Sequence, residues 1–236
     1  MTKKYKLRPI ERASHPPYIY PPYASTPLRG PKDELLPRVE TLSELTAPVY
    51  GSSDVTELDS DLTRNALING EPLGERIIVT GRVLDENKRP VPNALIEVWQ
   101  ANACGRYLHK NDQHDAPLDP NFTGAGRCIT NEHGVYRFIT IRPGAYPWPN
   151  HYNAWRPAHI HFSLFGPNFL SRLVTQMYFP GDPLQPLDPI FNSVDDEAAR
   201  NRLVATYDHD NLTEEMWALG FRFDIVLAGG QMTPFE

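Results

Sequence analysis

The most regular alternation of apolar and polar positions lies in residues 155–162, which read Trp-Arg-Pro-Ala-His-Ile-His-Phe. On a β-strand, residues two positions apart point to the same face. Ile160 and Phe162 would therefore face a core, while His159 and His161 would face one common site. The pattern predicts a strand that presents two imidazoles together, which is a candidate metal site.

Short apolar runs separated by turn residues continue through most of the chain after Gly74. Residues 131–134 have the composition of a hairpin connection. One modest helix is expected within 195–207 and a short one within 41–47. Many short strands with little helix favour an antiparallel sandwich or barrel. The expected strands cover residues 75–85, 94–101, 126–130, 135–141, 158–165, 172–179 and 221–228.

The first seventy residues lack this periodicity and are rich in proline. The chain has 24 prolines in 236 residues, and proline is excluded from helix interiors and central strands. The segment from His15 to Tyr23 is extended or polyproline-like, yet it is too aromatic for a typical disordered tail. We expect residues 1–70 to form an arm that packs on the domain or on a partner chain, and residues 71–236 to form a β-sandwich domain.

Composition narrows the class of protein. Apolar residues make up 40% and charged residues 22% of the chain, as in ordinary globular proteins. A net charge of −6 without a basic stripe argues against a nucleic-acid partner. No apolar run approaches a membrane span, and the basic start lacks the apolar stretch of a secretory signal. The sequence therefore predicts a cytoplasmic protein, in which Cys104 and Cys128 are small buried hydrophobes.

The remaining ligands of a two-histidine metal site are not fixed by the pattern. No acidic residue lies in the strand with the histidines, which weakens the ferrous site built from two histidines and a carboxylate. Tyr107 follows a strand and Tyr146 lies in a constrained loop, so both are candidates by position. However, the chain has 11 tyrosines, and most tyrosines serve packing. The other six histidines fall in loops or turns and are expected to be mostly solvated.

Six segments together resemble the intradiol ring-cleaving dioxygenases, and most closely the branch of that family that acts on protocatechuate. The resemblance runs from about Tyr18 to Asp224. It implies a mainly β, antiparallel, prealbumin-like sandwich with an extended Pro/Tyr-rich N-terminal arm and few short helices, in which residues 71–236 are catalytic. The segments are 74–78, 90–102, 118–122, 141–148, 155–162 and 221–226.

The resemblance implies one non-haem Fe³⁺ ion per chain, held by Tyr107, Tyr146, His159 and His161 with a water-derived hydroxide as fifth ligand. Phenols have an ordinary pKa near ~10, but metal ligands must be deprotonated and a trivalent ion stabilises the phenolate strongly. Two phenolates and one hydroxide neutralise the ion, which eases its burial.

The implied reaction is the O₂-dependent cleavage of protocatechuate (3,4-dihydroxybenzoate) between its hydroxylated carbons. The product would be 3-carboxy-cis,cis-muconate, in aromatic-compound catabolism through the β-ketoadipate pathway. Tyr146 would leave the ion and take up a substrate proton. Arg156 would stabilise negative charge on the substrate, and Gln176 would hydrogen-bond near the substrate or hydroxide. The pocket around the aromatic ring would be shaped by Tyr23, Trp148 and Ile190.

The resemblance also implies a partner, a homologous α subunit without iron ligands. The active site would lie at the αβ interface, and several αβ pairs would form a larger oligomer. Leu108 and Pro149 stand where this family commonly carries arginine and another basic residue. Both differences remove positive charge near the site and bear on its contacts with the substrate or the partner.

Two other hypotheses stay open. The first is an intradiol enzyme that acts on catechol or hydroxyquinol as a homodimer, although such relatives usually have a longer helical N-terminal domain than this short proline-rich segment. The second is a non-catalytic prealbumin-like binding module, which residues 90–98 allow. The binding module leaves the joint presence of two tyrosines and two histidines unexplained.

Overall fold

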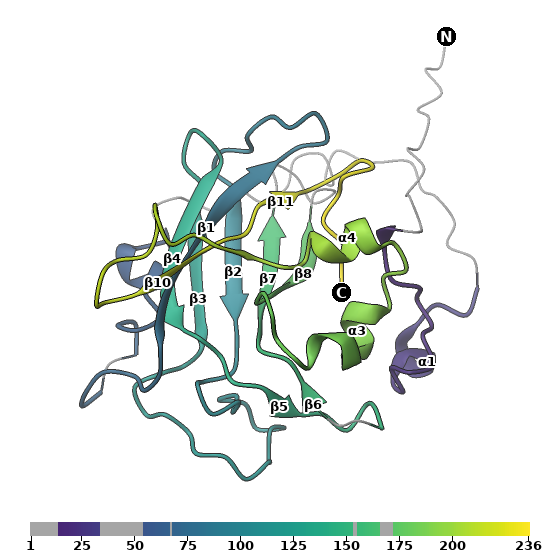
Figure 1. The fold of residues 1–236 in the computed structure, drawn as a ribbon, viewed down its shortest axis with the longest axis horizontal. Coiled ribbons are helices and arrows are strands. Elements are labelled where there is room, and N and C mark those ends of the chain that lie inside the picture. Colours follow the sequence, from purple (N-terminus) through teal and green to yellow (C-terminus); the bar gives the residue numbers. More distant parts are fainter. Residues whose placement is uncertain (1–13, 34–53, 67, 153–154, 166–171) are drawn as a thin grey trace.

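The computed structural model describes residues 14–33, 54–66, 68–152, 155–165 and 172–236. Two β-sheets form a sandwich, with α1, α3 and α4 at one side (Figure 1). The helix expected within 41–47 lies outside the described residues. The helices are α1 (Thr26–Arg29), η3 (Glu57–Ser60), η5 (Gln185–Leu187), α3 (Pro189–Asn192) and α4 (Glu197–Asn201).

The larger sheet has five strands and mixed pairing. β1 (Arg76–Leu84) is antiparallel to β4 (Val135–Ile141) but parallel to both β10 (Leu219–Arg222) and β11 (Ile225–Val226). β9 (Thr206–Tyr207) completes this sheet beside β10. The strand expected over 221–228 is therefore two short strands, which pair with successive parts of β1.

The smaller sheet is antiparallel throughout and carries the two histidines. Its order is β3 (Ala125–Ile129), β2 (Leu95–Trp99), β7 (His159–Phe165) and β8 (Leu173–Tyr178). A separate two-stranded ribbon, β5 (Tyr146–Pro147) with β6 (Trp155–Arg156), leads into β7. The expected sandwich is confirmed, and the strands within it agree closely with the apolar runs.

The turn at residues 131–134 is not the hairpin that its composition predicts. Gly134 N donates to Asn131 O, as in a tight turn, but β3 and β4 belong to different sheets. The turn passes the chain from one layer to the other. A local sequence signal fixes the turn, while the partner of each flanking strand is decided by distant residues.

The core fills the space between the sheets. Ile77 and Val79 of β1, Phe138 of β4, and Ile160 and Phe162 of β7 are all buried. The Phe138 and Phe162 rings pack edge to face with centroids 5.8 Å apart. Full burial of such a side chain contributes roughly 1.5–3 kcal/mol. This apolar layer anchors β7 and so fixes the direction in which its histidines point.

Parts of the N-terminal segment contact the sandwich. Leu62 is fully buried in the core, and Ala24 N donates to Asn150 O. His15 is also buried, not solvated as expected, and it stacks on Phe235 with centroids 4.5 Å apart. The two cysteines are free; Cys128 is buried as expected, but Cys104 is exposed.

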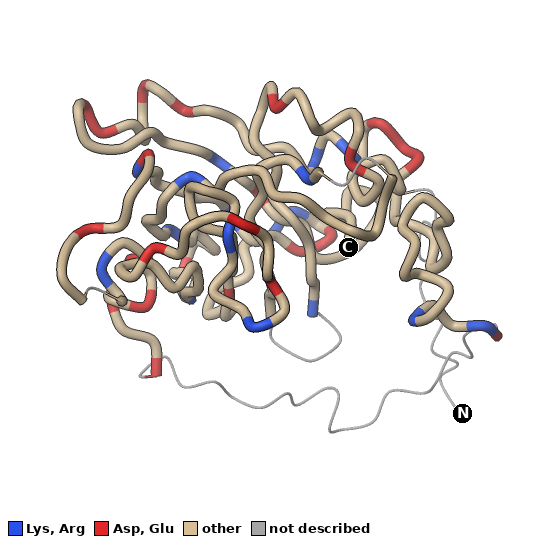
Figure 2. Tube along the Cα trace, turned by 90° about the horizontal axis from the view of Figure 1, so that it is seen from below, with Lys and Arg blue, Asp and Glu red and all other residues tan. Residues whose placement is uncertain are grey.

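Two general features bear on partners. Acidic and basic residues are interspersed along the described trace (Figure 2), which shows no basic stripe within these residues. None of the helices that the structure describes is long and apolar enough to span a membrane.

Candidate metal centre

The two histidines of β7 lie on one face of the smaller sheet, as the alternating pattern predicts. The centroids of the His159 and His161 rings are 4.8 Å apart, and the rings are inclined at 74°. Ile160 and Phe162 point the other way and are fully buried in the core. β7 thus presents two imidazoles to one region.

Two loops bring the predicted tyrosines to the same region. The Tyr107 and Tyr146 rings meet edge to face at 5.3 Å, the Tyr146 and His159 centroids are 5.5 Å apart, and those of Tyr107 and His161 are 6.3 Å apart. The structure therefore brings all four predicted ligands together. They come from the loop after β2, from the start of β5 and from β7 itself.

The loops approach closely because two glycines leave room for backbone. Gly105 has φ +77°, and a Cβ there would lie 2.0 Å from the Ala145 carbonyl oxygen. Asn102 holds the first loop, since its Oδ1 accepts from Cys104 N and Arg106 N. Gly144 N in turn donates to Asn102 O. The backbone of one tyrosine loop is therefore built against the other.

Each histidine uses Nδ1 in a hydrogen bond on the side of the ring opposite Nε2. His159 Nδ1 donates to Pro157 O at 2.7 Å, and His161 Nδ1 donates to Glu236 Oε2 at 3.0 Å. Burial lowers the pKa of His159 well below its usual range, and the positive charge of Arg156 lowers it further. The ring is therefore neutral, as a metal ligand must be.

The tyrosine hydroxyls supply oxygen donors to the same point. The Tyr107 hydroxyl is buried and has no hydrogen-bond partner among the described residues. Burial raises the pKa of Tyr107 and of Tyr146, although Arg156 opposes the shift at Tyr146. An unpartnered buried hydroxyl is costly, and a bound cation would satisfy it as a phenolate. Two phenols and two imidazoles are a donor set that fits a hard trivalent ion.

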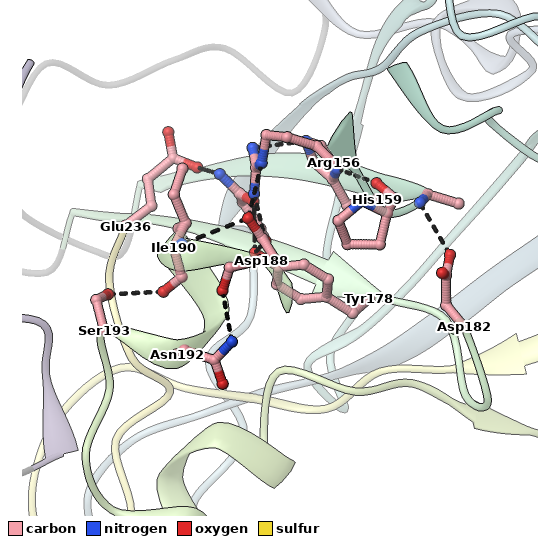
Figure 3. Close-up of polar contacts among 12 residues, drawn as sticks. Arg156, His159, Tyr178, Asp182, Asp188, Ile190, Asn192, Ser193 and Glu236 are labelled. Carbon is pink, nitrogen blue, oxygen red and sulfur yellow. Dashed lines mark hydrogen bonds and ion pairs between the residues drawn. The ribbon is translucent and has the colours of Figure 1, made fainter. Parts of the chain in front are cut away.

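A buried polar cluster centred on Arg156 lies beside His159 (Figure 3). Arg156 Nε and Nη2 donate to the two carboxylate oxygens of Asp188 at 3.1 and 2.8 Å. Its Nη1 lies 3.1 Å from His159 Nε2 and 3.4 Å from the Tyr146 hydroxyl. Nη2 also donates to Gln176 Oε1 at 2.6 Å. The guanidinium is thus fixed with one edge towards the tyrosine and histidine rings.

Gln176 is engaged at both ends of its amide. Its Oε1 accepts from Arg156 and from the Tyr178 hydroxyl, and its Nε2 donates to Glu236. These contacts favour a role in holding Arg156 and Glu236 in place. A direct contact with substrate, as expected from the resemblance, stays a prediction.

A cavity of about 750 Å³ opens in front of the rings. Tyr107, Tyr146 and His161 line it, and Trp148 forms part of its wall. Leu108 and Pro149, the two positions that depart from the family pattern, line it as well. The cavity is large enough for a substituted aromatic ring.

The two other predicted pocket residues, Tyr23 and Ile190, lie behind the residues that line the cavity. Tyr23 packs edge to face on Trp148, with ring centroids 4.7 Å apart. Ile190 lies in α3, whose first turn is capped by Asp188 (Figure 3). Within the described chain, neither residue is part of the cavity lining. Tyr23 supports Trp148, which lines the cavity, whereas Ile190 N donates to Asp188 behind it.

Sequence reasoning missed four residues of this site. Asp188 and Tyr178 form the cluster around Arg156, Trp99 stacks on His161, and Glu236 bonds to it. Asp188 directly before Pro189 has the pattern of a helix N-cap, but this signal does not reveal its ion pair. Glu236 is 75 residues from His161, and no local pattern links the two.

Comparisons with known proteins agree with this geometry. The profile of a family described as "Dioxygenase" matches residues 45–229. A second profile, described as "Protocatechuate 3,4-dioxygenase beta subunit N terminal", matches residues 9–37. The chain is 64% identical over 230 residues to the protocatechuate 3,4-dioxygenase beta chain of Burkholderia cepacia. The aligned region covers 98% of this chain and 97% of that protein.

More distant relatives share only part of their length. A hydroxyquinol 1,2-dioxygenase of Rhizobium sp. (strain MTP-10005) is 32% identical to this chain. The aligned region covers 66% of this chain but only 52% of that enzyme. Among solved structures, the 3-chlorocatechol 1,2-dioxygenase of Rhodococcus opacus 1CP superposes with a TM-score of 0.52 at 26% identity, covering 66% of this chain and 60% of that one.

Proposed function

The chain belongs to the intradiol ring-cleavage dioxygenase family, and from this we propose that it cleaves protocatechuate with O₂ between the two hydroxylated carbons, giving 3-carboxy-cis,cis-muconate. The observation that carries the proposal is the convergence of two phenols and two imidazoles, of which Tyr107, Tyr146 and His161 line one cavity. A non-catalytic binding module would have no use for that arrangement.

The share of each relative's length that aligns with this chain favours protocatechuate over other catechols as substrate. The chain matches almost the full length of a relative named for protocatechuate but about half of one named for hydroxyquinol. The second profile, specific to a protocatechuate 3,4-dioxygenase beta subunit, falls on the proline-rich arm. The arm is therefore the segment that supports this branch of the family.

Tyr107, Tyr146, His159 and His161 would hold one ferric ion. When bound, this ion would supply a Lewis acid that stabilises both phenolates and draws electron density from a coordinated catechol. The hydrogen bonds on the two Nδ1 atoms orient each imidazole with Nε2 towards the ion.

Tyr146 is our candidate for the base that takes a proton from a substrate hydroxyl. Its hydroxyl lies 3.4 Å from Arg156 Nη1, so the guanidinium can donate to the oxygen while it is an anion. Asp188 and Gln176 hold Arg156 in this position. Arg156 would also stabilise negative charge that develops on the substrate beside it.

We also propose a homologous α subunit as partner. The named relative is a beta chain, and exposed apolar side chains lie at the cavity rim and on the arm. Leu108 is 60% exposed, and Tyr18 and Ile19 of the arm are about half exposed. A partner that covered these residues would also close the open side of the cavity, where Leu108 and Pro149 provide no positive charge.

The decisive experiment combines colour, iron content and oxygen uptake. The iron-loaded protein should show a broad visible phenolate-to-iron absorption and take up O₂ with protocatechuate, faster with the α subunit present. His161→Ala should lose iron, whereas His133→Ala, at an exposed turn, should retain it. A protein that stays colourless after ferric iron is supplied would favour the binding module. Faster uptake with catechol would overturn the substrate assignment.

A further inference from the structure

We propose that Glu236 is a positioning residue whose carboxylate orients His161 and makes its ring a stronger donor to the metal. The inference rests on the proposed ferric site. It concerns a residue at the far end of the chain that the reaction itself does not require. Glu236 Oε2 accepts from His161 Nδ1 at 3.0 Å.

His161 is constrained in two independent ways. The indole of Trp99 lies parallel to the imidazole, with an interplanar angle of 4° and centroids 4.8 Å apart. Stacking fixes the plane of the ring, while the bond to Glu236 fixes its rotation within that plane. Together the two contacts leave Nε2 with one direction, on the side of the ring away from Glu236.

The two histidines differ in what they donate to. His159 Nδ1 donates to the neutral carbonyl of Pro157, whereas His161 Nδ1 donates to a carboxylate. A charged acceptor gives a stronger hydrogen bond and raises the basicity of a ligating imidazole. His161 is therefore the more electron-rich of the two nitrogen ligands, and Glu236 adds negative charge that favours the ferric over the ferrous ion.

Several contacts hold Glu236 in place. Glu236 N donates to Val174 O, and Thr175 Oγ1 donates to Pro234 O, so the segment is attached to β8. Gln176 Nε2 donates to the same carboxylate oxygen as His161. Phe235 stacks on His15, so the N-terminal segment supports the peptide that carries Glu236.

Two substitutions separate charge from geometry. Because both hydrogen bonds converge on Oε2, the amide oxygen of Glu236→Gln can accept both, and only the charge is lost. Glu236→Ala removes the bonds as well. Glu97→Gln is the matched control, since it removes a carboxylate from exposed Glu97 of β2, a strand that pairs with β7.

The readouts are the visible absorption band, the Fe³⁺/Fe²⁺ potential and the rate of iron release to a chelator. Glu236→Gln should shift the band to longer wavelength and raise the potential, because less negative charge stabilises Fe³⁺. Glu236→Ala should do both and release iron about 10–100-fold faster, while Glu97→Gln should match the unsubstituted protein.

The outcomes are distinguishable. If the unsubstituted protein binds iron and is coloured but Glu236→Gln leaves band and potential unchanged, this inference fails and the proposed function stands. A merely structural contact would give that result, with Glu236→Ala affecting only stability. If the unsubstituted protein binds no ferric iron, the proposed function and this inference fall together.

Discussion

Arg156 and Asp188 form an ion pair that is shielded from solvent directly behind the metal-site rings. The side chains are 2% and 0% exposed, and Nη2 lies 2.8 Å from Oδ2. Burial would lower the pKa of Arg156, but the charge of Asp188, together with Tyr178, Tyr146 and the hydrogen bond to Asp188, raises that pKa well above its usual value. The pair sets the direction of the guanidinium and ties the site to the first turn of α3.

Breaking this pair should cost far more stability than breaking an exposed one. Asp188→Asn leaves a buried guanidinium without its counter-ion, so we expect a loss of about 3–5 kcal/mol in the free energy of unfolding. Glu214→Gln is the control, because it breaks an exposed pair with Arg137 and should cost at most about 1 kcal/mol. Urea unfolding measures both. Equal losses in the two variants would contradict the prediction.

Stability and turnover should separate in an Arg156 double variant. Arg156→Gln alone strands a buried carboxylate and removes the cation beside Tyr146, so both unfolding free energy and turnover should fall while iron and colour remain. Adding Asp188→Asn removes the stranded charge and should recover much of the stability. Turnover, measured as oxygen uptake, should not recover. Recovery of both would show that Arg156 acts only through stability, and loss of iron would show that it supports the ligands directly.

Tyr107→Phe should have opposite effects in the metal-free and metal-loaded protein. Without metal, the variant removes a buried hydroxyl that has no partner among the described residues, and we expect a gain of about 1 kcal/mol in unfolding free energy. With iron it should lose a ligand and therefore most of the stabilisation that metal binding adds. Urea unfolding with and without ferric iron tests both signs.

Tyr207→Phe is the matched control for this pair of measurements. Tyr207 is 43% exposed on β9, and its loss should leave iron retention unchanged. A Tyr107→Phe protein with full iron content would remove Tyr107 from the ligand set.

The residues that sequence patterns place well are those whose partners are close in the chain. Alternation along residues 159–162 is sufficient to put both histidines on one face, because a strand reverses its side chains at every residue. The same reasoning finds most strands of both sheets, but not β9, which lies in the range 195–207 where a helix was expected and where α4 covers only Glu197–Asn201. It does not find the parallel pairing of β1 with β10. Ile77 pairs with Leu219, and no local pattern links residues so far apart in the chain.

The metal site was predictable only in part for the same reason. Two of its candidate ligands follow from periodicity, but Tyr107 and Tyr146 are indicated only by the family resemblance, because a tyrosine outside a regular pattern looks like any other. Asp188, Trp99 and Glu236 were missed, since each acts through a contact that only the folded chain creates. The expected hairpin at 131–134 failed because turn residues do not specify which sheet each flanking strand joins.

Gly105→Ala should disturb both tyrosine loops. The residue has φ +77°, and an added Cβ would lie 2.0 Å from Ala145 O, so the variant suffers both backbone strain and a collision. Gly181→Ala is a close control, because Gly181 has φ +76° with nothing within 4 Å of an added Cβ. The control should cost about 1–2 kcal/mol from strain alone. Gly105→Ala should cost more and also release iron faster. Equal iron release in the two variants would show that the collision is relieved without moving the tyrosines.

The alkaline limit of stability should depend on Tyr136, which lies in the core away from the metal site. Burial, followed by the charges of Cys128 and Asp224, raises the pKa of Tyr136 well above its usual value. Its hydroxyl donates to Phe223 O, so Tyr136→Phe should be less stable near neutral pH by about 1–3 kcal/mol. Above pH ~10 the unfolded chain loses this proton while the folded chain keeps it, so the wild type should lose about 1.4 kcal/mol more per pH unit than the variant. Urea unfolding between neutral and strongly alkaline pH should show the gap narrowing above pH ~10, and a constant gap would mean that Tyr136 ionises as readily in the folded protein as in the unfolded chain.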